Sequence, residues 1–235
     1  MELKSIKYGN SRINFQLVYK ERKTLGIKVY PDGAIIVTAP LDSTTEKIIE
    51  KVKNKAEWIF VQQTFFMLFE PRAIEKTYES GEGHLYLGRM YRLMIRQNSN
   101  KSIKLKGAYI WIETKDKKDK EKIKKELNEW YKSKAIIHFN QLYNQRLKIA
   151  EELSDKETLL KYKWYTNRWG SCFKNGTISL NLELIKAPKE CIDYVIVHEM
   201  CHLVHHNHSS KFYALLDKKL PRWRDSKIKL EKLLA

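Results

Sequence analysis

Two histidines and a glutamate near the C-terminal end of the sequence have a spacing that suits metal binding. His198, Glu199 and His202 form the pattern H-E-x-x-H. Four residues complete about one turn of an α-helix, so both imidazoles face the same side and can share one metal ion. A bound zinc ion lowers the pKa of its water to about 7, and a nearby carboxylate can take the proton as that water attacks a carbonyl. We expect Glu199 to be that base.

A third ligand is needed, because a catalytic zinc ion takes three protein ligands and leaves the fourth position to water. His208 fits best: it has the offset from His198 of the last histidine in H-E-x-x-H-x-x-G-x-x-H. However, His205 stands at the glycine position and no methionine follows His208, which argues against a metzincin. His205 and His206 remain alternatives if the helix continues, whereas Asn207 suits a left-handed helix end that returns His208 to the metal. The downstream carboxylates rank lower and are Asp217, Asp225 and Glu231.

The segment that carries this pattern is predicted to be a buried helix. Pro188 suits the first helical position. Apolar residues surround the pattern on nearly all sides and are Ile192, Val195, Ile196, Val197, Leu203 and Val204. Histidines and a glutamate in such a helix cost free energy unless a partner satisfies them, and a metal ion does so for the imidazoles. Nitrogen and oxygen ligands favour zinc, although iron, cobalt and nickel also bind imidazole.

A structural zinc site is the main alternative. It would be closed by a fourth protein ligand, for which His205, His206 or Cys172 could serve. Glu199 argues against this alternative, because a structural site gains nothing from a carboxylate beside the metal-binding histidine.

The composition limits the class of protein. The 235 residues can bury a full core in one large domain or two small ones. Three cysteines are too few for a disulfide framework, which favours a reducing compartment. No apolar run approaches a membrane span and the first residues have no signal-peptide core, so we expect a cytoplasmic protein. The net charge of +17 is typical of proteins that work near nucleic acid, but it could also reflect a lysine-rich composition.

The N-terminal part of the chain predicts β-structure around one helix. Alternating apolar residues begin at Ile13, and the turn Pro31-Asp32-Gly33 joins two further strands. Helical spacing then predicts a single helix over about residues 43–70, ending before Pro71. Its aromatic end, which includes Phe65, Phe66 and Phe69, is expected in the core. Residues 78–112 predict more strands.

The C-terminal part predicts the elements that position the histidines. A charged run over Lys115–Lys125 leads into a long helix over about residues 117–150. Asn175-Gly176 is a hairpin signal. The alternation over Thr177–Ile185 predicts a half-buried strand, which could border the cleft and accept an extended peptide or could simply pack on the helix.

Taken together, these motifs resemble the YgjP-like family of zinc metallopeptidases. The resemblance rests on Arg168–Cys172, on Asp193–Leu203 and on Asn207-His208-Ser209 with Phe212, and it extends to N-terminal patterns including Pro31-Asp32-Gly33. It implies a zincin-type core in which His198, His202 and His208 bind the metal and Glu199 is the base. The family is also similar to SprT-like and WLM proteases, some of which act on proteins bound or crosslinked to DNA.

We therefore expect an α+β fold. A β-rich region over residues 1–115 with one helix would join a zincin-like core over 116–235, with a supporting helix, a short sheet and the H-E-x-x-H helix. We expect the two parts to form one continuous family unit. The expected function is a zinc-dependent peptidase that acts on peptides or proteins, with non-specific nucleic acid as a further partner. The alternatives are a metal-dependent hydrolase of another bond and a nucleic-acid-binding protein with a structural zinc.

Overall fold

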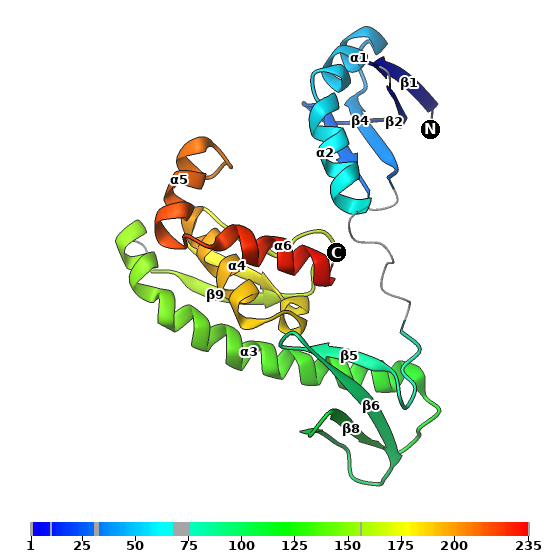
Figure 1. The fold of residues 1–235 in the computed structure, drawn as a ribbon, viewed down its shortest axis with the longest axis vertical. Coiled ribbons are helices and arrows are strands. Elements are labelled where there is room, and N and C mark those ends of the chain that lie inside the picture. Colours follow the sequence, from blue (N-terminus) through cyan, green and yellow to red (C-terminus); the bar gives the residue numbers. More distant parts are fainter. Residues whose placement is uncertain (1, 10, 31–32, 68–75, 156, 235) are drawn as a thin grey trace. The chain divides into compact units, whose positions relative to one another are not determined.

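The computed structural model describes residues 2–9, 11–30, 33–67, 76–155 and 157–234. The chain has an α+β fold and divides into two compact units, one within residues 1–73 and the other within residues 74–234 (Figure 1). Among the described helices, none combines the length and apolarity that a membrane crossing needs.

The first unit is a four-stranded mixed sheet with two helices. The strands are β1 (Glu2–Tyr8), β2 (Ser11–Lys20), β3 (Gly26–Val29) and β4 (Ile35–Pro40), in the order β1-β2-β4-β3. The predicted alternation is confirmed, because Ile13, Phe15 and Leu17 are buried between exposed neighbours. The antiparallel pairing of β3 with β4 confirms the predicted turn at Gly33, where φ is +76°.

The single helix expected over residues 43–70 is two helices. They are α1 (Thr45–Lys53) and α2 (Ala56–Met67), with Thr44 and Asn54 at the two ends of α1. Asn54 ends α1 because asparagine competes poorly inside a helix, and its backbone N–H bonds the carbonyls of Glu50 and Val52. Apolar residues on both sides of this break still pack into one core, since Ile48 and Ile59 are buried in the same cluster. The aromatic end at Phe65, Phe66 and Phe69 lies outside the described side chains.

The second unit contains two sheets and the long helix α3 (Lys120–Leu153), which confirms the predicted supporting helix. The first sheet has the order β5-β6-β8-β7 and consists of β5 (Gly83–Tyr86), β6 (Arg89–Gln97), β7 (Ser102–Lys106) and β8 (Tyr109–Thr114). In Figure 1 it lies against the N-terminal half of α3. Leu93, Ile110 and Ile112 pack with Ile123 and Leu127 of α3 in one hydrophobic core.

The boundary between the two observed units differs from the boundary between residues 115 and 116 that the sequence suggested. Strands β5–β8 share their core with α3 and belong to the second unit. The sequence pattern locates the strands but contains no information on which helix covers them.

The second sheet is short and lies beside the H-E-x-x-H helix. It has the order β10-β11-β9 and consists of β9 (Leu159–Lys163), β10 (Gly170–Cys172) and β11 (Thr177–Asn181). The antiparallel pairing of β10 with β11 confirms the predicted hairpin at Asn175-Gly176. The strand predicted over Thr177–Ile185 is shorter, because Leu182–Lys186 forms the 3₁₀-helix η1, and the side chain of Asn181 accepts a hydrogen bond from the N–H of Glu183 at its start. The strand is also buried along its whole length, and not half-buried as predicted. Helices α4 (Lys189–Cys201), α5 (Ser210–Lys219) and α6 (Trp223–Leu234) follow.

A strained turn attaches the first sheet of this unit to the start of α4. Leu87 and Gly88 join β5 to β6 with φ angles of 48° and 79°, and their backbone N–H groups donate to the carbonyls of Ile185 and Lys186 at 2.9 Å. A β-carbon on Gly88 would come 2.5 Å from Cγ of Pro188. The turn therefore needs glycine both for its backbone angles and for its approach to Pro188.

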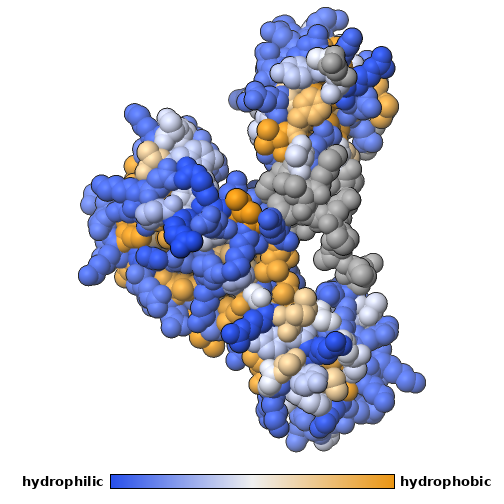
Figure 2. All heavy atoms as spheres, viewed as in Figure 1, coloured by the Kyte–Doolittle hydropathy of each residue, from blue (hydrophilic) through white to orange (hydrophobic). Residues whose placement is uncertain are grey.

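Hydrophilic residues cover most of the second unit on the face shown in Figure 2.

Candidate metal centre

Helix α4 presents the histidines from a buried frame. As predicted, it is buried on nearly all sides: nine of its thirteen residues are buried, including Glu199. Pro188 is its N-cap, and His202 is the C-cap in a right-handed conformation. The helix thus ends at the second histidine and not near Asn207, which is absent from the described non-glycine residues with positive φ. After His202 the chain instead turns back through successive backbone hydrogen bonds. One of them is donated by the N–H of His205 to the carbonyl of Cys201 at 3.1 Å.

The turn after α4 brings three imidazoles together. Nε2 of His208 lies 3.0 Å from Nε2 of His198 and 3.2 Å from Nε2 of His202. Two nitrogens that bind zinc at about 2.0–2.1 Å with tetrahedral angles lie about 3.4 Å apart, so the observed spacing suits one shared ion. Within the described part of the chain, these three residues form the one group of three or more histidine, cysteine or carboxylate ligands that could hold a metal.

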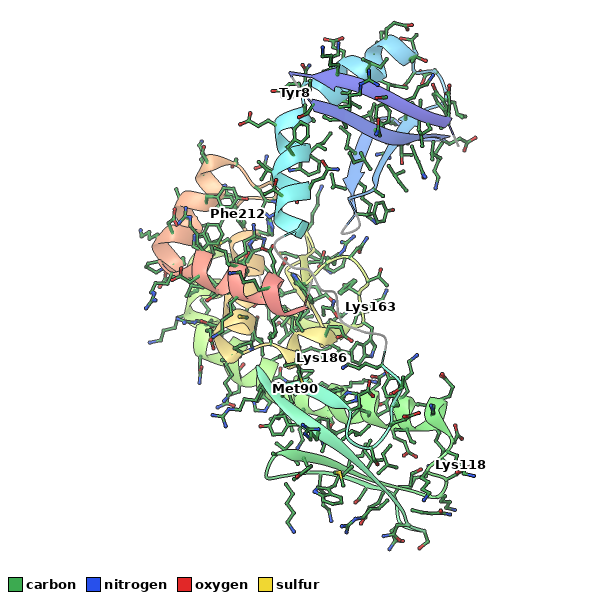
Figure 3. All side chains as sticks on the ribbon, turned by 45° about the vertical axis from the view of Figure 1, so that its right-hand side comes forward. Tyr8, Met90, Lys118, Lys163, Lys186 and Phe212 are labelled. Atoms are coloured by element: carbon green, nitrogen blue, oxygen red, sulfur yellow. The ribbon has the colours of Figure 1, made fainter. Side chains whose placement is uncertain are left out.

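The rings of the three histidines are held in place by their surroundings. Nδ1 of His202 lies 2.8 Å from the backbone carbonyl of His205, so the ring donates its Nδ1–H there and presents its Nε2 lone pair to the centre. Phe212 of α5, labelled in Figure 3, is fully buried. Its ring centroid lies 4.9, 4.5 and 4.8 Å from those of His198, His202 and His208. Ser209 is the N-cap of α5, although its side chain makes no capping hydrogen bond.

The environment of the imidazoles favours their neutral forms. Burial, reinforced by the neighbouring rings of His202 and His208, lowers the pKa of His198 to about 3. Burial also lowers the pKa values of His202 and His208. Neutral imidazoles keep the lone pairs that a metal needs, so the donor set fits a divalent cation at neutral pH.

Glu199 lies next to this centre and is only 5% exposed. Burial raises its pKa to about 8, against the opposing effects of the Arg168 charge and a hydrogen bond from the Cys172 backbone. A β-carbon on Gly170 would come 2.6 Å from Oε1 of Glu199, so only glycine leaves room for the carboxylate. The carboxylate is thus held between α4 and β10, in an environment that strengthens it as a base.

The three histidines and Glu199 line one cavity of about 510 Å³. Strand β10 forms part of its wall through Gly170, Ser171 and Cys172. Because β10 pairs only with β11 among the described strands, it is an edge strand, while β11 lies in the middle of the sheet. The strand that borders the cavity is therefore β10 and not the predicted strand that begins at Thr177.

The residues that the sequence offers as alternative metal ligands do not converge with the three histidines. His206 and Cys172 line the cavity, and the carbonyl of His205 anchors His202, but none of the three belongs to the converging group of described residues. Asp217 accepts hydrogen bonds from Trp223 and Arg224. The arrangement therefore favours His208 as the third ligand.

The sequence did not identify an aromatic stack behind the histidines. Trp223 lies between Tyr194 and Tyr213, with ring centroids 6.0 and 5.6 Å away and interplanar angles of 14° and 15°. Tyr194 contacts the ring of His198, and Tyr213 contacts the ring of His208. The position of Tyr194 one turn before His198 was the only available signal, since Trp223 comes from a separate helix.

Three convergent imidazoles and a buried carboxylate, placed on a helix beside a short sheet, are the arrangement expected of a metal-dependent hydrolase. The family model described as the YgjP-like metallopeptidase domain matches residues 23–233, so the chain belongs to the YgjP-like family. This match confirms the resemblance found in the sequence. No curated protein matches the chain.

Proposed function

We propose that this protein is a zinc-dependent peptidase in which His198, His202 and His208 hold the metal and Glu199 is the general base. The convergence of three Nε2 atoms carries the proposal, with spacings of 3.0 and 3.2 Å. When bound, zinc would acidify a water molecule and polarise the substrate carbonyl. Neutral imidazole donors with no fourth protein ligand among the described residues suit a catalytic zinc better than a structural one.

Glu199 would take the proton from the attacking water and pass it to the leaving amine. A general base works best when its pKa lies near the operating pH, and burial of Glu199 acts in that direction. The backbone N–H of Cys172 and the charge of Arg168 favour the ionised form of the carboxylate and partly offset the effect of burial.

The edge strand β10 supports peptides as the substrate class. An extended peptide could add to β10 through backbone hydrogen bonds, which would place one of its carbonyls over the histidines. Hydrolysis of another bond is the alternative, and it would not need this strand.

Substitution of Glu199 by Gln tests the proposal. The amide keeps the shape of the side chain but cannot accept the proton, so we expect hydrolysis of a peptide library to fall by about 10²-fold or more while one zinc per chain is retained. Glu190→Gln is the matched control, because it makes the same change in the first turn of the same helix. Full turnover by the purified Glu199→Gln protein would remove Glu199 from the base role.

We also propose that the protein acts near nucleic acid, because its net charge is +17. Phosphate contacts by lysine and arginine would supply affinity without sequence preference.

A further inference from the structure

The outer face of the first sheet in the second unit carries aromatic and cationic side chains together. Along β8, Ile110 and Ile112 are fully buried towards α3, so the alternating residues Tyr109, Trp111 and Glu113 lie on the opposite face. Tyr109 is 39% exposed. The two aromatic rings lie 5.9 Å apart between centroids. This aromatic pair is not needed to pack the core, because the core lies on the opposite face of the sheet.

The strand register places a cation beside each ring. Tyr109 pairs with Arg92 on β6 and with Lys106 on β7. Trp111 pairs with Lys104 on β7, and the guanidinium of Arg96 lies 4.1 Å from its ring centroid. Because paired residues point to the same side of a sheet, these groups share one face.

The positive charge on this face exceeds the negative charge. The four cations are exposed, and within the described part of the chain none of them forms a salt bridge. Glu113 is the one carboxylate on this face of the described strands; a hydrogen bond from Ser102 at 2.7 Å and the charges of Lys104 and Arg96 lower its pKa. One carboxylate against four cations leaves the face with a net positive charge beside the rings of Tyr109 and Trp111.

We propose that this face, formed by Arg92, Arg96, Lys104, Lys106, Tyr109 and Trp111, binds single-stranded nucleic acid. Unpaired bases stack on aromatic rings and on guanidinium planes, while lysine and arginine contact the phosphates. A duplex hides its bases inside the stack, so the rings would contribute nothing to duplex binding. The inference deepens the nucleic-acid part of the proposed function but does not depend on the metal site.

The platform is separate from the cavity that holds the histidines. No residue of β6, β7 or β8 lines that cavity. In Figure 1 the sheet lies against the N-terminal half of α3, whereas α5, which carries Phe212, lies towards its other end. Binding of a strand would therefore leave the cavity open to a protein attached to, or bound near, the same strand.

Binding of labelled oligothymidylate and oligouridylate to the full chain tests the platform, with a duplex of equal length for comparison. We expect both single strands to bind more tightly than the duplex at near-physiological salt. Four phosphate contacts predict a slope of about 2.8 for log affinity against log salt, from about 0.7 per contact on a single strand. The two probes differ in the 2′-hydroxyl, so any preference between them separates RNA from DNA as the natural ligand.

Two sets of variants locate the binding. Trp111→Thr should weaken binding about 5-fold or more through the loss of stacking, and Trp111→Phe should restore most of it. Lys104→Gln with Lys106→Gln should lower the salt slope by about 1.4. Lys161→Gln with Lys163→Gln is the matched control, because these exposed lysines have the same spacing on β9 of the other sheet (Lys163 is labelled in Figure 3). Thermal unfolding of each variant reports whether it is folded.

Three results would overturn the proposal. The first is tighter binding to duplex than to single strands, and the second is an equal loss of affinity in the Lys161/Lys163 control. The third is a change in the oligomeric state of folded Trp111→Thr, with unchanged nucleic-acid binding, which would assign the face to a second copy of the chain. None of these results bears on peptide hydrolysis, so failure of the platform and failure of the proposed peptidase are distinguishable.

Discussion

Gly170 and Glu199 are in such close contact that a single methyl group could not fit between them. A β-carbon on Gly170 would lie 2.6 Å from Oε1, 2.7 Å from Cγ and 2.9 Å from Cδ of Glu199. The Glu199 side chain is buried, with an exposed fraction of only 5%. Strand β10 therefore sets the position of the proposed base, although the base itself belongs to α4.

Gly170→Ala should thus reduce catalysis without removing the metal. The added methyl group displaces the carboxylate from the water it would deprotonate, and a misplaced general base costs about 10²-fold or more in kcat/KM. Peptide hydrolysis and zinc content measured on the same preparation check this. Ser171→Ala, the next residue of the same strand, is the control for general damage to β10. Unchanged kcat/KM in Gly170→Ala would show that the position of Glu199 does not matter for the reaction.

His208→Ala should weaken metal binding far more than His206→Ala. Both histidines line the cavity, but only His208 places its Nε2 next to those of His198 and His202. Loss of a ligand should exceed the roughly 10–100-fold loss of affinity that follows removal of an outer-shell partner. Competition with a chromophoric chelator measures both affinities. Equal affinities for the wild-type protein and His208→Ala would transfer the third-ligand role to another residue.

Gly88→Ala should destabilise the second unit more than Gly107→Ala. Both glycines have positive φ, at 79° and 59°, so both substitutions carry a backbone cost of about 1–2 kcal/mol. Only Gly88 has neighbours where the β-carbon would lie, with Cγ of Pro188 at 2.5 Å and open space around Gly107. The clash should add about 1–3 kcal/mol. Denaturant unfolding of the two variants gives the difference, and equal losses would show that the β5–β6 turn does not depend on its contact with Pro188.

The sequence predicts what is local and misses what depends on packing. The spacing of His198, Glu199 and His202, the long helix α3 and the hairpin at Asn175-Gly176 all follow from short-range patterns. The break at Asn54 is missed because the apolar spacing continues through it.

Contacts between distant segments explain the remaining differences. The ring of Phe212 against all three histidines, the closeness of Gly170 to Glu199 and the stacking of Trp223 each join separate elements. One sequence holds no direct record of these pairs. The segment Arg168–Cys172 is part of the family resemblance, but only the structure shows that its glycine makes room for the proposed base.

A crystal structure of the zinc-loaded protein, with the metal located by anomalous scattering, tests the central claim most directly. We expect one zinc ion about 2.0–2.1 Å from Nε2 of His198, His202 and His208. We also expect a water molecule as the fourth ligand, within about 2.6–3.2 Å of the Glu199 carboxylate. A fourth ligand from the protein, such as Cys172 or His206, or a zinc ion bound away from these histidines, would contradict the proposed catalytic site.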